Sequence, residues 1–276
     1  MKVHHVNCAT LCPVLGKLFV NRDGYMICHC LVVETSEGLV LVDTGLGTRD
    51  LADPRRALGG PFAGIVRPRL DPEELATRQV EKLGFKAADV RHIVMTHLDL
   101  DHAGGLRDFP QATVHVHRLE LDAARARATR NERQRYRRHQ LEGVRFEAHE
   151  PDGEGEDWFG FRAVKPLPGL DIALVPLLGH TRGHCGVAVR GPGGWLLHCG
   201  DAYFHADQMR PDREACSRGL WAFQRLMALD NAARQVNVNR LRALAQDRRS
   251  EIRLFSAHDP SEFRALSTGD PVRLFA

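Results

Sequence analysis

A dense run of metal-competent side chains directly follows a short apolar segment in this sequence. Residues 93–95 (Ile-Val-Met) have the pattern of a buried strand, and residues 96–105 follow with the sequence Thr-His-Leu-Asp-Leu-Asp-His-Ala-Gly-Gly. Side chains alternate along an extended chain, so His97 and Asp99 project to one side and the leucines between them to the core. Asp101 and His102, at the turn, can face a second ion. The run therefore predicts a metal site at the end of a buried strand.

The flanking sequence predicts strands and helices in two similar halves. Residues 25–42 have the pattern of paired buried strands that end at Asp43-Thr44-Gly45. Asp71, followed by proline and two glutamates, predicts the start of a helix that Gly84 stops. Further strands are expected at 113–116, 172–175, 187–189, 195–197 and 252–255, with a helical region across 220–244. Strands, a helix and strands again, repeated in two halves, indicate a layered α/β fold.

Length and charge favour one catalytic domain over residues 1–276, with a charged helical insertion at about 118–157. The 38 basic and 35 acidic residues nearly cancel, so net charge does not imply a nucleic-acid partner. Locally the charge is uneven: residues 118–142 have a helical pattern with eight arginines, and residues 147–157 are acidic. The segment is interpreted as a solvated helix, a lid over the pocket or a phosphate grip.

The expected location is cytoplasmic, without a membrane partner. The first residues are polar, and no apolar run approaches the roughly 20 residues of a membrane span. Seven cysteines, an odd number, indicate reduced thiols. Cys8, Cys12, Cys28 and Cys30, with His29, could hold an extra metal, although their spacing matches zinc knuckles poorly.

The run at 97–102 resembles the His-x-His-x-Asp-His signature of the metallo-β-lactamase superfamily, with aspartate at the third position. Residues 179–184 (Gly-His-Thr-Arg-Gly-His), 200–202 (Gly-Asp-Ala) and 257–259 (Ala-His-Asp) resemble later elements of the same family, in family order. The resemblance implies an αββα four-layer sandwich, a bridging carboxylate and two divalent metal ions. The implied ligands are His97, Asp99, Asp101, His102, His180, Asp201 and His258.

Several residues outside this ligand set also have candidate roles. His184, four residues beyond His180, is expected to support the ligands, with direct ligation as the alternative. Asp43 is expected to support the ligands or to stabilise the turn at its strand end, rather than to bind a metal. Tyr203 is a candidate oxyanion donor, because some lactonase relatives carry a tyrosine near this point. A polar cluster at the start of the chain (His4, His5, Asn7 and Cys8) is a possible part of the pocket wall.

The ligand set predicts hydrolysis by a metal-bridging hydroxide. Two cations sharing Asp201 would lower the pKa of a bridging water toward about 7, and Asp201 or a nearby pocket residue would protonate the leaving group. Asp99 is the departure from the family pattern. A carboxylate there brings the charge of the site near zero, so the site is expected to be less electrophilic. The histidines His97 and His180 favour zinc, but the harder carboxylate ligand lets manganese or iron(II) compete.

The family hosts many reactions, so the substrate is inferred by analogy. The sequences around Asp201 and His258 most resemble the branch that opens acyl-homoserine lactones, which favours a lactone or another small carboxylic ester. The alternative is a phosphodiesterase or nuclease-like hydrolase, in which the arginine-rich segment binds phosphates. A non-catalytic metal-binding protein is a third possibility. The oligomeric state is not predicted.

Overall fold

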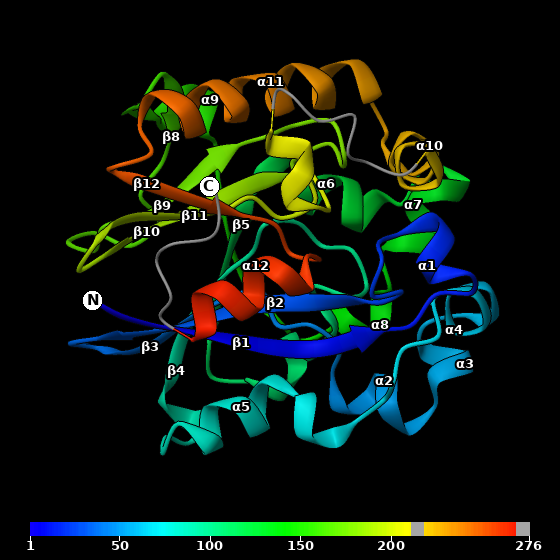
Figure 1. Cartoon of the computed structure of the whole chain (residues 1–276). Helices are drawn as coiled ribbons and strands as arrows, with labels where there is room; N and C mark the ends of the chain where they lie inside the picture. Colours follow the sequence, from blue (N-terminus) through cyan, green and yellow to red (C-terminus); the bar gives the residue numbers. More distant parts are fainter. Residues whose placement is uncertain (211–217, 269–276) are drawn as a thin grey trace.

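Two β-sheets packed face to face form the centre of the computed structural model, which describes residues 1–210 and 218–268 (Figure 1). Side chains from both sheets interleave between them: Val33, Val42 and Val94 come from one, and Leu174 and Val187 from the other. All five are fully buried, and burial of a side chain of this size contributes about 1.5–3 kcal/mol. Within the described ranges, no helix is long and apolar enough to cross a membrane.

The first sheet has six strands in sequence order. Strands β1 to β3 pair antiparallel, whereas β3 to β6 pair parallel. The strands are β1 (Lys2–Leu11), β2 (Met26–Thr35), β3 (Gly38–Val42), β4 (Val90–Val94), β5 (Thr113–His117) and β6 (Arg145–His149).

The second sheet has four strands in the order β12-β11-β10-β9, in which only β11 and β12 run parallel. These strands are β9 (Ile172–Pro176), β10 (Cys185–Gly191), β11 (Gly194–His198) and β12 (Ile252–Phe255). A small hairpin of β7 (Glu156–Trp158) and β8 (Phe161–Ala163) precedes them.

Helices cover the outer face of each sheet and complete four layers. Leu121 of α6 and Val80 of α5 pack on the six-stranded sheet, and Leu241 and Leu244 of α11 pack on the other. Figure 1 shows α5 and α11 on opposite sides of the two sheets. The α-helices are α1 (Gly16–Phe19), α2 (Thr48–Ala52), α3 (Pro54–Ala57), α4 (Gly60–Ile65), α5 (Ala76–Lys82), α6 (Arg118–Ala126), α7 (Arg130–Arg135), α8 (Arg138–Leu141), α9 (Pro151–Glu154), α10 (Arg218–Met227), α11 (Asn231–Asp247) and α12 (Pro260–Ser267).

The arginine-rich segment is not one helix, contrary to the sequence-based expectation. It folds into α6, α7 and α8, because Arg127 adopts a left-handed conformation (φ 46°) after α6 and Thr129 caps a new helix. The chain then enters β6, which pairs along β5 as the edge of the six-stranded sheet. Part of the predicted insertion at 118–157 is therefore built into the central sheet.

The loops after four strands meet at one edge of the two sheets. Asp43 directly follows β3, the run from His97 follows β4, Asp201 follows β11 and His258 follows β12. His180 lies in the loop between β9 and β10. The fold thus brings together residues that are up to 215 positions apart, counting from Asp43 to His258.

Candidate metal centre

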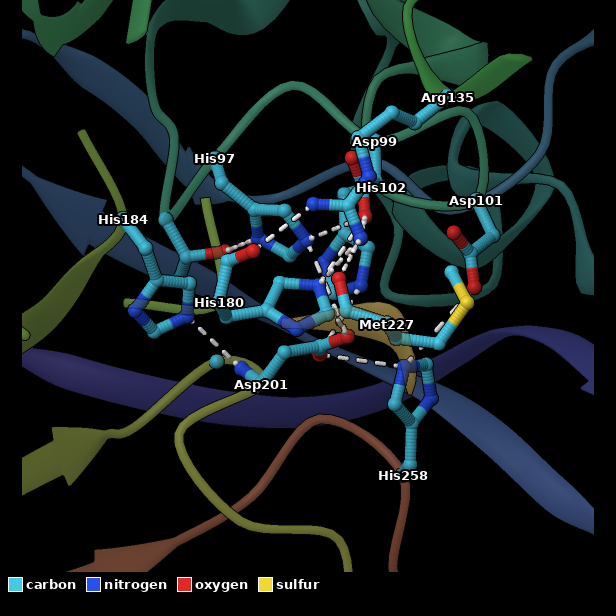
Figure 2. Close-up of polar contacts among 12 residues, drawn as sticks. His97, Asp99, Asp101, His102, Arg135, His180, His184, Asp201, Met227 and His258 are labelled. Carbon is cyan, nitrogen blue, oxygen red and sulfur yellow. Dashed lines mark hydrogen bonds and ion pairs between the residues drawn. The ribbon is translucent and has the colours of Figure 1, made fainter. Parts of the chain in front are cut away.

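The segment after β4 has the alternation that the sequence predicts. Leu98 is fully buried and Leu100 is nearly so, whereas His97 and Asp99 turn toward the other candidate ligands (Figure 2). The segment is held on its core side by Glu120 of α6, whose carboxylate accepts the Leu98 backbone N–H at 2.9 Å.

Four side chains form a first group with the spacing of a tetrahedral site. Asp99 Oδ2 lies 3.1 Å from His180 Nε2 and 3.4 Å from His97 Nε2. Asp201 Oδ2 lies 3.3 Å from His180 Nε2 and 3.8 Å from His97 Nε2. A tetrahedral zinc ion with bonds of about 2.0–2.1 Å needs ligand atoms about 3.3–3.4 Å apart. These four atoms therefore fit a single ion.

A second group shares Asp201 with the first. Its other carboxylate oxygen, Oδ1, lies 3.3 Å from His102 Nε2 and 3.1 Å from His258 Nε2. Asp101 Oδ2 lies 3.8 Å from His258 Nε2, and the Cys28 thiol of β2 is within 4.8 Å of both. Asp201 thus presents one oxygen to each group, which is the arrangement of a carboxylate that bridges two ions.

Three of the imidazoles carry their proton on Nδ1, which leaves the lone pair of Nε2 directed at the centre. His102 Nδ1 donates to Asp43 at 2.8 Å, and His258 Nδ1 donates to the Ile27 carbonyl at 2.7 Å. The Thr96 hydroxyl donates to Asp43, so it accepts from His97 Nδ1 at 2.9 Å. Each Nδ1 therefore carries the proton, and each Nε2 is free to bind a metal.

Buried polar atoms without hydrogen-bond partners support the same conclusion. His97 Nε2, His102 Nε2, Asp99 Oδ1 and Asp201 Oδ1 are all buried, and none of them has a hydrogen-bond partner among the residues that the structure describes. An unpaired buried polar group costs about 1–3 kcal/mol, so such a concentration at one place needs an explanation. The donor set of imidazoles and carboxylates suits a divalent transition metal, and the residues present fit two ions.

Asp43 and His184 position other members of the centre. Asp43 has a left-handed backbone (φ 57°) and accepts three hydrogen bonds, two from Thr96 and one from His102. Burial acts to raise its pKa, but the bond from His102 and the charges of nearby histidines lower the pKa to about 2. His184 donates from Nδ1 to the Leu177 carbonyl and accepts the Asp201 N–H at Nε2. Both of its nitrogens are occupied, so it supports Asp201 and is not free to act as a ligand.

The position directly before Asp201 requires a glycine. Its φ is +53°, and a Cβ there would lie 2.6 Å from His184 Nε2 and 3.0 Å from Thr96 Cβ. The close approach lets the Asp201 N–H reach His184.

Two buried glutamates connect the loops of the centre and were not found from the sequence. Glu120 accepts the Leu98 N–H with one oxygen and the Gly183 N–H with the other, at 2.9 and 3.0 Å. Glu132 of α7 accepts Arg182 Nε at 2.7 Å. Helices α6 and α7 therefore tie the His97 segment to the loop that carries His180.

Arg135 is a further residue that sequence reasoning missed. Its guanidinium is buried beside Asp99, with Nη2 3.3 Å from Asp99 Oδ2, and it donates to the carbonyls of His180 and Met227 (Figure 2). Burial acts to raise the pKa of Asp99, but Arg135 and His97 hold the pKa well below its usual value. The centre therefore includes a buried arginine. Neither the solvated helix nor the lid suggested for the arginine-rich segment included such a contact.

Tyr203 is not placed as an oxyanion donor. Its side chain is fully buried, and its hydroxyl donates to Glu262 of α12 at 2.8 Å. The adjacent residue, Phe204, lines the cavity over the metal centre instead. The turn after β11 thus directs residues 203 and 204 to different surroundings, and the Tyr203 hydroxyl does not face the candidate ligands.

The N-terminal polar cluster and the cysteines also differ from the suggested roles. His4 pairs with Glu34, His5 with His29, and Asn7 with Thr10 and Glu74, while Cys8 is buried in the core. None of the cluster's four residues lines the cavity at the metal centre. Among the cysteines, Cys28 lies near Asp101 and His258 rather than in a separate thiol site.

A cavity of about 390 Å³ opens onto both groups of candidate ligands. Asp99, Asp101, His180, Asp201 and His258 form its polar end. The rest of the wall is mainly apolar, with contributions from Leu11, Met26, Phe62, Ile65, Phe204 and Phe223. The site therefore combines a small polar reaction zone with a hydrophobic chamber.

Comparison with known proteins agrees with this geometry. Residues 23–258 match the family model described as the metallo-beta-lactamase superfamily. A Mycobacterium tuberculosis protein named "Probable metallo-hydrolase" is 41% identical over 273 residues, covering 96% of this chain and 82% of that protein. An N-acyl homoserine lactonase of Bacillus cereus is 28% identical over 156 residues, 56% of this chain and 55% of the lactonase.

A solved structure shows the same fold at low sequence identity. The B. thuringiensis protein AiiA, solved with N-decanoyl-L-homoserine at its active site, superposes with a TM-score of 0.71. The match covers 96% of this chain and 95% of that one, at 20% identity. The αββα layers, the two groups sharing Asp201 and the family match lead to one conclusion: the chain belongs to the metallo-β-lactamase superfamily and is a hydrolase of that family.

Proposed function

We propose that this protein is a binuclear metal-dependent hydrolase that opens lactones or other small carboxylic esters carrying an apolar chain. The observation that carries the proposal is the position of Asp201, which offers one oxygen to each of two ligand groups at the polar end of a largely apolar cavity. His97, Asp99, His180 and Asp201 would hold one divalent ion, and His102, Asp201, His258 and Asp101 the other.

The ions, when bound, would lower the pKa of a water so that it is deprotonated and nucleophilic near neutral pH, and would polarise the carbonyl that it attacks. The chain's own residues orient the reaction. Asp43 and Thr96 hold the imidazoles of His102 and His97, and His184 holds the Asp201 backbone. Asp101 has the most exposed of the three carboxylates, with 14% of its side chain accessible against 5% for Asp201. It is therefore the residue we assign to proton transfer to the leaving alcohol.

The cavity wall supports an apolar substituent on the substrate. Phe62, Ile65 and Phe223 line the chamber beyond the candidate ligands, and none of them offers a polar side chain. The named activities of the lactonase relatives agree with an acyl-bearing lactone. Zinc is the first choice of metal, with manganese or iron(II) as alternatives, because the four atoms of the first group include two carboxylate oxygens.

The phosphodiesterase hypothesis has less support than the lactone or ester hypothesis. It relied on arginines that could bind phosphate, but the terminal nitrogens of the two arginines that line the cavity already donate to protein groups. Arg135 contacts Asp99 and two carbonyls, and Arg137 donates to the Leu58 carbonyl.

The test is a hydrolysis panel with protein reconstituted with zinc, manganese or iron(II). It compares lactones with short and long acyl chains, aryl esters, thioesters and bis-aryl phosphodiesters. We expect kcat/KM to be highest for long-chain lactones or esters and to vanish on chelation. Turnover of the phosphodiesters alone would contradict the proposal.

A matched pair of variants tests the role of the apolar wall. Ile65 is 61% exposed and lines the cavity, whereas Val236 of α11 is 60% exposed and does not. Ile65→Asp is expected to raise KM for long-chain substrates about tenfold and leave short-chain substrates unchanged, because a carboxylate opposes burial of a hydrocarbon. Val236→Asp is the control. Equal effects of Ile65→Asp on both chain lengths would show that the wall does not bind the chain.

A further inference from the structure

Arg135 is a buried cation in direct contact with the carboxylate that replaces the family's histidine. Its side chain is 3% exposed, and Nη2 lies 3.3 Å from Asp99 Oδ2. The guanidinium is held in place from two sides, because Nη1 donates to the His180 carbonyl and Nη2 to the Met227 carbonyl, each at 2.9 Å. The contact is therefore part of a fixed arrangement.

The helix that carries Arg135 is itself anchored to the centre. Thr129 and Glu132 form reciprocal capping bonds at the start of α7, and Glu132 also accepts Arg182 Nε. Arg182 is two residues beyond His180. The position of the guanidinium is thus tied to the same loop that supplies one of the candidate ligands.

Asp99 faces both the arginine and the metal group with the same oxygen. Besides Arg135, Oδ2 has His180 Nε2 at 3.1 Å and His97 Nε2 at 3.4 Å. A carboxylate oxygen has more than one lone-pair direction, so it can bind a metal and accept from a guanidinium at once. An ion pair that only stabilised α7 would not require Asp99 Oδ2 to face two imidazoles as well. The His97 Nδ1 and the backbone carbonyl of His180 already have other partners.

The net charge of the metal centre indicates a shared role for Asp99 and Arg135. Two divalent ions, three carboxylates and one hydroxide sum to about zero, whereas a histidine at position 99 would leave about plus one. The Arg135 guanidinium adds one positive charge within 3.3 Å of Asp99. Asp99 and Arg135 together therefore carry the net charge of one neutral histidine.

We propose that Arg135 is a positioning residue of the metal centre, which orients Asp99 toward the first ion and offsets its charge, so that the two residues act as a unit in place of one histidine. The inference rests on the proposed function, specifically on Asp99 as a ligand. It also predicts the effect of Asp99→His, which would leave the buried Arg135 guanidinium beside a metal ion without its carboxylate partner.

The test is a double-mutant cycle on metal affinity with Asp99→His and Arg135→Met. The overall affinity for zinc is measured by competition with a chromophoric chelator, and the number of ions by elemental analysis. In the wild-type background, Arg135→Met should lower this affinity by about 10- to 100-fold, the usual effect of removing a partner of a ligand. Asp99→His alone should lower it at least as much.

The informative result is the combined variant. In the Asp99→His background, Arg135→Met should raise the affinity at least tenfold, because it removes the uncompensated cation. A reversal of sign between backgrounds is not expected from a purely structural arginine. Equal effects of Arg135→Met in both backgrounds would overturn the inference, whereas a wild-type protein that binds no metal would instead refute the proposed function.

Arg133→Met is the matched control. Arg133 lies on the same helix, is exposed, and donates to the carbonyls of Arg127 and Ala128. Removing its charge should leave metal affinity unchanged in both backgrounds. If Asp99→His does not fold, Asp99→Asn serves in the cycle, because it keeps the side-chain shape while removing the charge that Arg135 contacts. Thermal unfolding of the metal-free variants separates lost affinity from lost structure.

Discussion

Glu120 offers a sharp test of how the loops of the metal centre are held. Its side chain is fully buried, and its two oxygens accept one backbone N–H from the segment carrying His97 and one from the loop carrying His180. Glu120→Ala would leave both N–H groups buried and unpaired. At about 1–3 kcal/mol for each, we expect the free energy of unfolding to fall by about 2–6 kcal/mol. Metal affinity should fall as well, although no ligand is removed.

The measurement is urea unfolding of Glu120→Ala and Asp122→Ala, with and without zinc, together with competition for zinc. Asp122 is exposed on the same helix, so its variant controls for loss of a carboxylate from α6. Glu120→Gln should be intermediate, because its amide nitrogen cannot accept one of the two bonds. If Glu120→Ala stays within about 0.5 kcal/mol of Asp122→Ala and binds zinc equally well, the bridge between the loops does not stabilise the centre.

Three further predictions follow from single contacts. Asp201→Ala should reduce the metal content from two ions per chain to one or none by elemental analysis, because each Asp201 oxygen faces a different group; Asp171→Ala, an exposed carboxylate paired with Lys165, should keep both. Gly200→Ala should lower stability by about 1–3 kcal/mol more than Gly160→Ala in thermal unfolding, since both glycines have positive φ but only Gly200 has neighbours where a Cβ would lie. Tyr203→Phe should cost about 1 kcal/mol of stability through the lost bond to Glu262 and leave kcat unchanged; a large fall in kcat at unaltered stability would return Tyr203 to the reaction.

The central strands and the order of the candidate ligands could be predicted from the sequence. A buried strand can be recognised from its own run of apolar residues. Strands β2, β3 and β4 were therefore expected close to where they lie. The alternation of His97 and Asp99 with buried leucines was confirmed for the same reason. Strand β1 was harder to define, because Lys2, His4 and Asn7 interrupt its apolar pattern.

The contacts that organise the centre could not be predicted, because they depend on tertiary position. Arg135 is one of eight arginines in its segment, and nothing in the spacing distinguishes it from the exposed Arg133. The Thr129 to Glu132 spacing of a capping box was the available signal that a new helix starts there. Tyr203 misled in the opposite way, since proximity in sequence to Asp201 did not put its hydroxyl in the cavity.

The sharing of Asp201 has a consequence for how the centre fills. An ion in either group would fix the rotamer of the Asp201 carboxylate, and with it the oxygen that the other group needs. Binding of the first ion therefore includes the entropy cost of ordering the Asp201 side chain, and binding of the second ion does not. The result is positive cooperativity between the two sites. We expect a titration with zinc to pass directly from empty to doubly loaded protein, with the singly loaded form scarce throughout.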